Sequence, residues 1–172
     1  MRALLVVVWV IVPAAAAGEP PTRWHDYTSK EGRFAVSFPG PPKEERHTVK
    51  TPAGPLTTTT VIARLNRAAV CTVAYHDVSD AAVKASTADQ RLNLLRDGAV
   101  QSLQGKLLSE KKVERDRFPG RELLIELPDQ AVYRTRVYVA GARVYQVVVK
   151  GPPEAVTSQE ADRFLDSFHI KP

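Results

Sequence analysis

The side chains that could do chemistry are few in this sequence and widely separated. The single cysteine, Cys71, stands in a predicted strand, where a free cysteine is more often a small buried apolar residue than a nucleophile. The histidines form no H-x-H or H-x-x-x-H pair, so we expect no metal site and no other cofactor. The four histidines are His25, His47, His76 and His169.

One histidine is directly followed by an acid, and this pair leaves an alternative open. His76 and Asp77, with groups from nearby loops, could form the site of a small-ligand-binding protein or a hydrolase, because catalytic triads are defined by geometry and not by chain order. The sequence has no G-x-S-x-G, H-E-x-x-H or P-loop motif, however. We therefore favour a non-enzymatic protein and keep the site near His76 and Asp77 as the alternative.

Two arginines on one predicted strand form part of a mixed polar and aromatic face. Arg134 and Arg136 project from the same side, and the expected register adds Glu122, Tyr138 and Tyr145. These five residues are a candidate interaction face for an anion or an acidic partner. Cross-strand pairing of the arginines with Glu122 is the simpler interpretation, because acids are interleaved with the bases here.

The register comes from two short loops. Alternating apolar residues predict three consecutive strands, at 121–127, 132–140 and 143–150. A three-residue loop joins the first pair, and Gly141-Ala142 joins the second, where glycine in first position suits a type II′ turn. Tyr138 then lies opposite Tyr145, and Glu122 lies opposite Arg136. Both faces of this sheet carry apolar residues, so we expect cover on both.

The remaining elements supply further strands and two helices. Strands are predicted at 34–38, 46–50, 56–65, 70–76 and 107–115. Apolar spacing predicts a helix over 88–104, with Thr87 and Gln90 as its capping box, and a C-terminal helix with a box at Thr157 and Glu160. The expected fold is α+β, an antiparallel sheet covered by helices on both faces in an α/β/α sandwich.

Two segments remain beside these elements. The polar stretch from Lys43 to Pro55 is predicted as a loop with a short edge strand, and it is a second candidate for contacts with a partner. Near the start of the domain, aromatic residues could line a ligand groove, but they more often close one end of a core. These residues are Trp24, Tyr27, Phe34 and Phe38.

The first 17 residues are typical of a secretory signal peptide. Arg2 precedes the apolar run Leu4–Val12, and small residues follow, with cleavage expected near Ala16 or Ala17. A membrane anchor is the alternative, but this apolar stretch is short of the ~20 residues that a span needs. We therefore expect a secreted or periplasmic protein without a stable membrane span after cleavage, in which 18–23 form an extended leader and 24–172 a single domain.

Composition excludes several classes of protein. Of 172 residues, 44% are hydrophobic and 25% charged, as in ordinary soluble domains. One cysteine allows no intramolecular disulfide. A net charge of +5 is mild, and no aromatic residues stand among the clustered bases, so we expect no nucleic-acid partner.

The two ends of the domain resemble secreted bacterial domains of the PsbP/Mog-like superfamily. The resemblance rests on W-x-x-Y-x-S-x-E-G-R-F-x-V-x-F-P-G-x-P over 24–42 and on F-L-D-S-F over 164–168. It implies an α/β/α sandwich and supplies no catalytic residue, since members of that superfamily serve as photosystem II subunits or assembly factors, or as a partner of a small GTPase. We therefore expect a non-enzymatic binding or accessory domain that contacts an unknown protein of the cell envelope.

Overall fold

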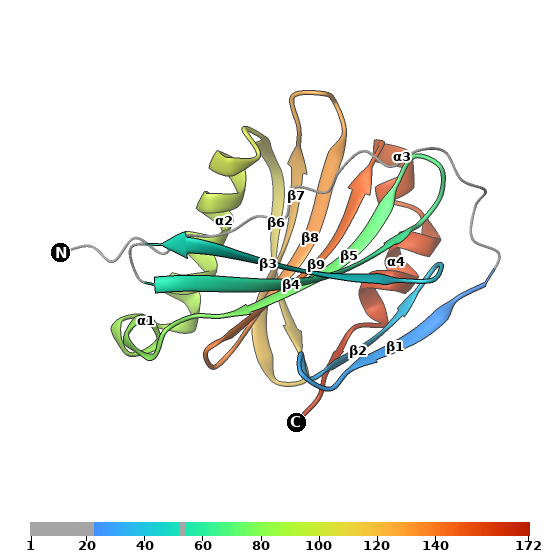
Figure 1. Cartoon of the computed structure of the whole chain (residues 1–172). Helices are drawn as coiled ribbons and strands as arrows, with labels where there is room; N and C mark the ends of the chain where they lie inside the picture. Colours follow the sequence, from blue (N-terminus) through green and yellow to red (C-terminus); the bar gives the residue numbers. More distant parts are fainter. Residues whose placement is uncertain (1–22, 52–53) are drawn as a thin grey trace.

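A computed structural model describes residues 23–51 and 54–172 (Figure 1). The predicted signal peptide and nearly all of the leader lie outside the described residues. Within these ranges, no helix combines the length and the apolar character needed to cross a membrane. The helices are α1 (Asp80–Ala85), α2 (Ala88–Ser102), α3 (Pro153–Val156) and α4 (Gln159–Asp166).

The strands form two antiparallel sheets. The smaller sheet has the order β1-β2-β10 and consists of β1 (His25–Ser29), β2 (Phe34–Phe38) and β10 (His169–Ile170). The larger sheet has seven strands in the order β3-β4-β5-β9-β8-β7-β6. Its strands are β3 (Lys43–Thr51), β4 (Gly54–Arg64), β5 (Val70–Asp77), β6 (Lys106–Arg115), β7 (Phe118–Glu126), β8 (Val132–Ala140) and β9 (Arg143–Gly151).

The predicted hairpin register is confirmed. Tyr138 pairs with Tyr145 across β8 and β9, and Glu122 pairs with Arg136 across β7 and β8. Gly141 has a φ of 64°, in the left-handed region, as the first position of a type II′ turn requires. The prediction of an antiparallel sheet is confirmed with it.

Two hydrophobic clusters use alternate residues of the same strands. In β9, Val144 and Val148 belong to one cluster, which also contains Leu92 and Leu95 of α2. The next residue along, Tyr145, belongs to the other cluster, to which α3, α4 and the small sheet contribute. Since successive strand residues point to opposite faces, the two clusters lie on opposite faces of β9, called here the α2 face and the α4 face.

The aromatic residues at the start of the domain pack into the α4-face cluster. Phe34 and Phe38 are fully buried, and the ring of Phe38 lies 5.3 Å from that of Phe164 in α4. Tyr27 contacts both Phe34 and Phe38, and Trp24 packs at the margin beside Arg163. Their prediction as residues that close one end of the core is confirmed.

Helix α2 forms where its sequence signals predict. Thr87 is its N-cap, and the reciprocal hydrogen bonds of the capping box with Gln90 are present. Gly105 does not take the left-handed conformation beyond the helix; Gln104 does, with a φ of 49°. Gly105 instead allows the backbone to pass close to β7, because a Cβ at this position would lie 2.4 Å from a side-chain carbon of Ile125.

Several local predictions are wrong. The segment expected as a loop is for the most part β3, a nine-residue strand. The short elements β1, α1, α3 and β10 were not predicted. The cap of the last helix is Ser158, whose hydroxyl accepts a hydrogen bond from the Ala161 amide, and not Thr157. Thr157 instead ends α3 and donates its hydroxyl proton to the Pro153 carbonyl.

Candidate functional site

The candidate face around Arg134 and Arg136 is engaged within the chain. Glu122 accepts hydrogen bonds from both arginines, at 3.4 Å from Arg134 and 2.6 Å from Arg136. Helix α4 supplies one further carboxylate to each: Asp162 lies 2.7 Å from Arg134, and Asp166 lies 2.6 Å from Arg136. The expected pairing with Glu122 is therefore present, and it extends to acids that are distant in the sequence.

The charged side chains of the two strands are only slightly exposed, whereas Asp162 and Asp166 of α4 expose 51% and 63% of their side-chain surface. The side chains of Arg134, Arg136 and Glu122 expose 14%, 12% and 15% of their surface. Burial acts to lower the pKa of Arg136, but its hydrogen bonds to Glu122 and Asp166 outweigh that effect and raise the pKa above its usual value. The arginines thus fasten α4 to the sheet and leave little of their surface for a partner.

The two tyrosines of the candidate face are part of the core. Tyr138 and Tyr145 are 1% and 2% exposed, and the ring of Phe168 packs against both, at 5.8 and 5.5 Å. The Tyr145 hydroxyl donates a hydrogen bond to the Gly32 carbonyl at 2.7 Å, which ties the main sheet to the small one. A partner that contacted these rings would have to displace the C-terminal segment.

His76 and Asp77 do not form a joint site. His76 is 3% exposed on the α2 face, and burial lowers its pKa to about 4. Asp77 belongs to the opposite face and makes two hydrogen bonds to Arg143, at 2.7 and 2.6 Å. Those bonds lower the pKa of Asp77. The imidazole is therefore neutral at pH 7 and the carboxylate already has its partner.

Cys71 is fully buried, and burial raises the pKa of its thiol well above the ordinary value. A buried thiol is a poor nucleophile because the thiolate is the reactive form. The described residues also contain no group of three or more histidine, cysteine, aspartate or glutamate side chains that could hold a metal ion.

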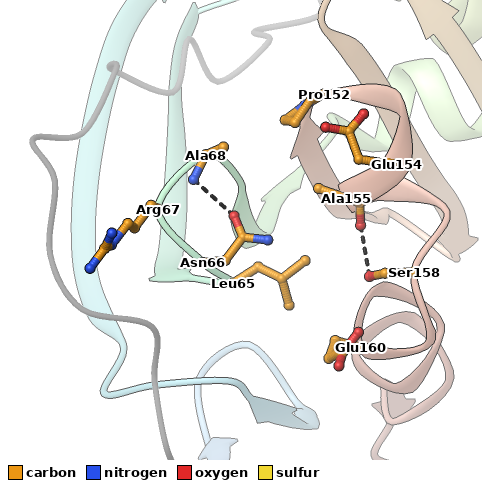
Figure 2. Close-up of a pocket in the computed structure, with 9 residues that line it drawn as sticks. All are labelled: Leu65, Asn66, Arg67, Ala68, Pro152, Glu154, Ala155, Ser158 and Glu160. Atoms are coloured by element: carbon orange, nitrogen blue, oxygen red, sulfur yellow. Dashed lines mark hydrogen bonds between the residues drawn. The ribbon is translucent and has the colours of Figure 1, made fainter.

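A groove lies between the β4–β5 turn and the corner of α3 and α4 (Figure 2). It encloses about 690 Å³. Its polar groups already serve the local fold: the Asn66 carboxamide accepts hydrogen bonds from two backbone amides of its own turn, and the Ser158 hydroxyl donates to the Ala155 carbonyl. The groove offers small apolar side chains and flanking charges from Arg67, Glu154 and Glu160.

The β3–β4 hairpin forms one edge of the main sheet (Figure 1). Within the part of the chain that the structure describes, β3 is an edge strand that pairs with β4 alone, and most of its side chains are exposed. β4 pairs with β5 only from Thr59 onward, so the tip of the hairpin is a two-stranded ribbon, here called the β3–β4 ribbon. Val49, which is 36% exposed, lies opposite Leu56 on this ribbon.

The sequence interpretation missed a set of buried polar side chains on the α2 face. Their oxygen atoms have no hydrogen-bond partner among the described residues. The only signal was the run of threonines at 57–60, which was interpreted as a preference for strand. The oxygens are Oγ1 of Thr58, Thr60, Thr72 and Thr135 and Oε1 of Gln146.

Comparison with known proteins identifies the fold. No protein-family profile matches the chain, and no curated protein sequence matches it. The solution structure of cyanobacterial PsbP (CyanoP) from Synechocystis superimposes with a TM-score of 0.58 at 11% sequence identity, over 96% of this chain and 98% of that one. A protein of unknown function from Pseudomonas aeruginosa, described as a putative regulator, gives a TM-score of 0.43 at 11% identity, over 81% of this chain and 90% of that one. The chain therefore has a PsbP-like fold.

Proposed function

We propose that this chain is a secreted or periplasmic, non-enzymatic accessory domain that binds another protein of the cell envelope through the β3–β4 ribbon. Residues 1–17 act as a cleaved signal peptide, and 24–172 form one PsbP/Mog-like domain with helices over both faces of its sheet. The N-terminal charge and apolar pattern supports export, and the PsbP-like fold supports an accessory role.

The observation that carries the proposal is the open edge of β3. This strand is nine residues long and, among residues 23–51 and 54–172, pairs on one side only, so its other side presents backbone donors and acceptors that an added strand can use. A two-stranded ribbon is marginally stable without further contacts. Contact with a partner would supply them.

The chemistry of β3 favours a selective partner over self-association. Its sequence, KEERHTVKT, carries charges of both signs, and charged edges resist pairing with unrelated strands. Part of that charge is already engaged with the small sheet, because Arg46 pairs with Glu31, and Glu44 accepts a hydrogen bond from Tyr27. The partner is therefore expected to combine an extended segment with an apolar contact for Val49 and Leu56.

The test is recovery of that partner with ribbon variants. The full chain, tagged at its C-terminus, is expressed in its native cells, crosslinked in the envelope and purified. Val49→Asp places a charge on the ribbon without changing the core and should abolish recovery of the partner. Leu108→Asp is the matched control, because Leu108 is an exposed apolar residue on β6, the opposite edge of the sheet. Equal recovery with both variants, or recovery of no specific protein, would contradict the proposal.

A further inference from the structure

The groove between the β4–β5 turn and the corner of α3 and α4 has both room for a ligand and access from solvent (Figure 2). It encloses about 690 Å³, within the ~300–1,000 Å³ of ordinary ligand sites, and several of its lining side chains are exposed. It is called here the turn–helix groove. The lining residues that bear on its chemistry are Leu65, Asn66, Glu154, Ala155 and Glu160.

Both walls of the turn–helix groove are held by contacts within the fold. On the helical side, Arg134 of β8 donates hydrogen bonds to the Val156 carbonyl at the end of α3 and to Asp162 of α4, at 3.1 and 2.7 Å. On the other side, the Leu65 amide donates to the Ala69 carbonyl at 2.9 Å and closes the turn. The groove is therefore preformed, and a ligand does not have to order its walls on binding.

The middle of the turn–helix groove is apolar, and most of its side chains are short. Leu65 points from the turn toward the helices, and Ala155 stands across from it on α3 (Figure 2). Ala68 and Pro152 add further apolar surface to the lining. Short side chains allow a ligand backbone to come close, so this stretch suits an extended chain with small apolar residues.

Two carboxylates flank the apolar stretch on the helical side. Glu154 and Glu160 are exposed and lie toward opposite ends of the helical wall, with Ala155 and Ser158 between them (Figure 2). Among the residues that the structure describes, neither carboxylate has a hydrogen bond or an ion pair. Arg67, which belongs to the turn side, points away from the groove (Figure 2). The groove thus presents unpaired negative charge, which a cationic ligand would complement.

The turn side of the groove offers an unused hydrogen-bond donor. Oδ1 of Asn66 accepts hydrogen bonds from the amides of Ala68 and Ala69, both at 2.8 Å. These two bonds fix the orientation of the carboxamide, so its Nδ2 points into the groove (Figure 2). Within residues 23–51 and 54–172, this nitrogen has no hydrogen-bond acceptor. A carboxamide nitrogen donates to carbonyl oxygens, and every peptide bond carries one.

We propose that the turn–helix groove binds an extended basic segment of another polypeptide, in which lysine or arginine stands beside small apolar residues. The small residues cover the apolar stretch, a backbone carbonyl accepts from Asn66, and the basic side chains pair with Glu154 and Glu160. The groove lies beyond the Arg64 end of β4, whereas the β3–β4 ribbon has its tip at Gly54, the other end of the same strand. Either proposal can therefore fail without the other.

Titration with capped pentapeptides tests the proposal. The probes are N-acetylated, C-amidated peptides of alanine and proline in three sets, which carry lysine or arginine, glutamine, or glutamate. Each set is added to the purified full chain, and NMR follows the Asn66 side-chain amide and the backbone amides of the β4–β5 turn. We expect the basic peptides to shift these signals and to bind about tenfold more tightly than the glutamine peptides, with a smaller difference at high salt. No shift with the basic peptides, or equal binding of all three sets, would overturn the proposal.

Putrescine, a free diamine, separates a peptide site from a site for small cations. It carries two ammonium groups but no carbonyl for Asn66 and no backbone to cover the apolar stretch. It should therefore bind more weakly than the basic peptides under the same conditions. Binding of putrescine as tight as that of the peptides would assign the groove to small amines and overturn the proposal.

Isosteric variants of the two acids provide the second arm. Glu154→Gln and Glu160→Gln each remove one negative charge from an exposed side chain, so each should weaken binding of the basic peptides about threefold. Glu126→Gln is the matched control, because Glu126 is an exposed acid on β7 that does not line the groove. It should leave the affinity unchanged. Unchanged affinity in either groove variant, or an equal loss in Glu126→Gln, would overturn the assignment of the site.

Discussion

Phe168 closes the α4 face of the sheet, and its removal should cost much of the stability of the domain. The side chain is fully buried, and its ring lies 5.6 Å from Phe34, 5.8 Å from Tyr138 and 5.5 Å from Tyr145. Phe168→Ala leaves a cavity among rings that cannot collapse into it, because each is held by a different strand. Such substitutions cost about 3–5 kcal/mol, out of roughly 5–15 kcal/mol for a whole domain.

Urea unfolding followed by circular dichroism measures this loss directly. We expect the free energy of unfolding to fall by about 4 kcal/mol with an unchanged slope, and the melting temperature to fall by roughly 10 °C. Leu94→Ala is the control, because Leu94 is 46% exposed on α2 and its loss should change stability by less than about 0.5 kcal/mol. A loss below about 1.5 kcal/mol for Phe168→Ala would refute the view that this face is closed core.

Two further predictions concern buried titratable groups. The pKa of His76 is about 4 in the folded chain and ordinarily 6.5, so below pH 6.5 the unfolded chain binds a proton that the folded chain does not. Stability should therefore fall as the pH drops from 6.5 to 4, by up to about 3 kcal/mol from this residue. His76→Gln should remove that part of the slope in urea midpoints measured between pH 7 and pH 4.5, and an unchanged slope would show that His76 is protonated in the fold. Cys71 should not react with a thiol reagent in the native chain and should react fully in guanidinium, because it is buried and its pKa is raised; fast native labelling would show that β5 is accessible.

The parts of the fold that follow from local rules could be predicted from the sequence. The two-residue loop at Gly141-Ala142 fixes the pairing of β8 with β9, and period-two alternation then assigns each residue to a face. Counting from the Tyr138–Tyr145 pair, alternation puts Leu123 and Val148 on one face and Tyr145 on the other, as the two hydrophobic clusters have them. The capping box at Thr87 is equally local.

The cover of the candidate interaction face by α4 depends on contacts that sequence patterns do not encode. Asp162 and Asp166 are about thirty residues from the arginines that they bind, at sequence separations of 28 and 30. Nothing in their spacing shows which strand α4 will cover. The predicted register puts the residues of the candidate interaction face on one side of the sheet, as the structure does: Arg134, Arg136, Glu122, Tyr138 and Tyr145. Only the tertiary structure shows that the C-terminal segment covers that side.

Two other features were obscured by their composition. β3 is charged at most positions, so neither apolar alternation nor strand preference identifies it, and its pairing with β4 organises it. The threonines of β4 have a strong preference for strand, and this preference does not reveal which of their hydroxyls are buried without a hydrogen-bond partner. Only burial without hydrogen-bond partners distinguishes Thr60 from Thr59, its neighbour on the opposite face.

Hydrogen exchange at β3 is the most direct test of the proposed role of this domain. In the isolated chain, the amides of Lys43–Thr51 that do not pair with β4 should exchange rapidly, because they lie at the open edge of the sheet. In the complex captured from the envelope, these same amides should become strongly protected, while the amides of β6 at the opposite edge keep their rates. Unchanged exchange along β3 in the complex, or new protection confined to β6, would contradict binding through the β3–β4 ribbon.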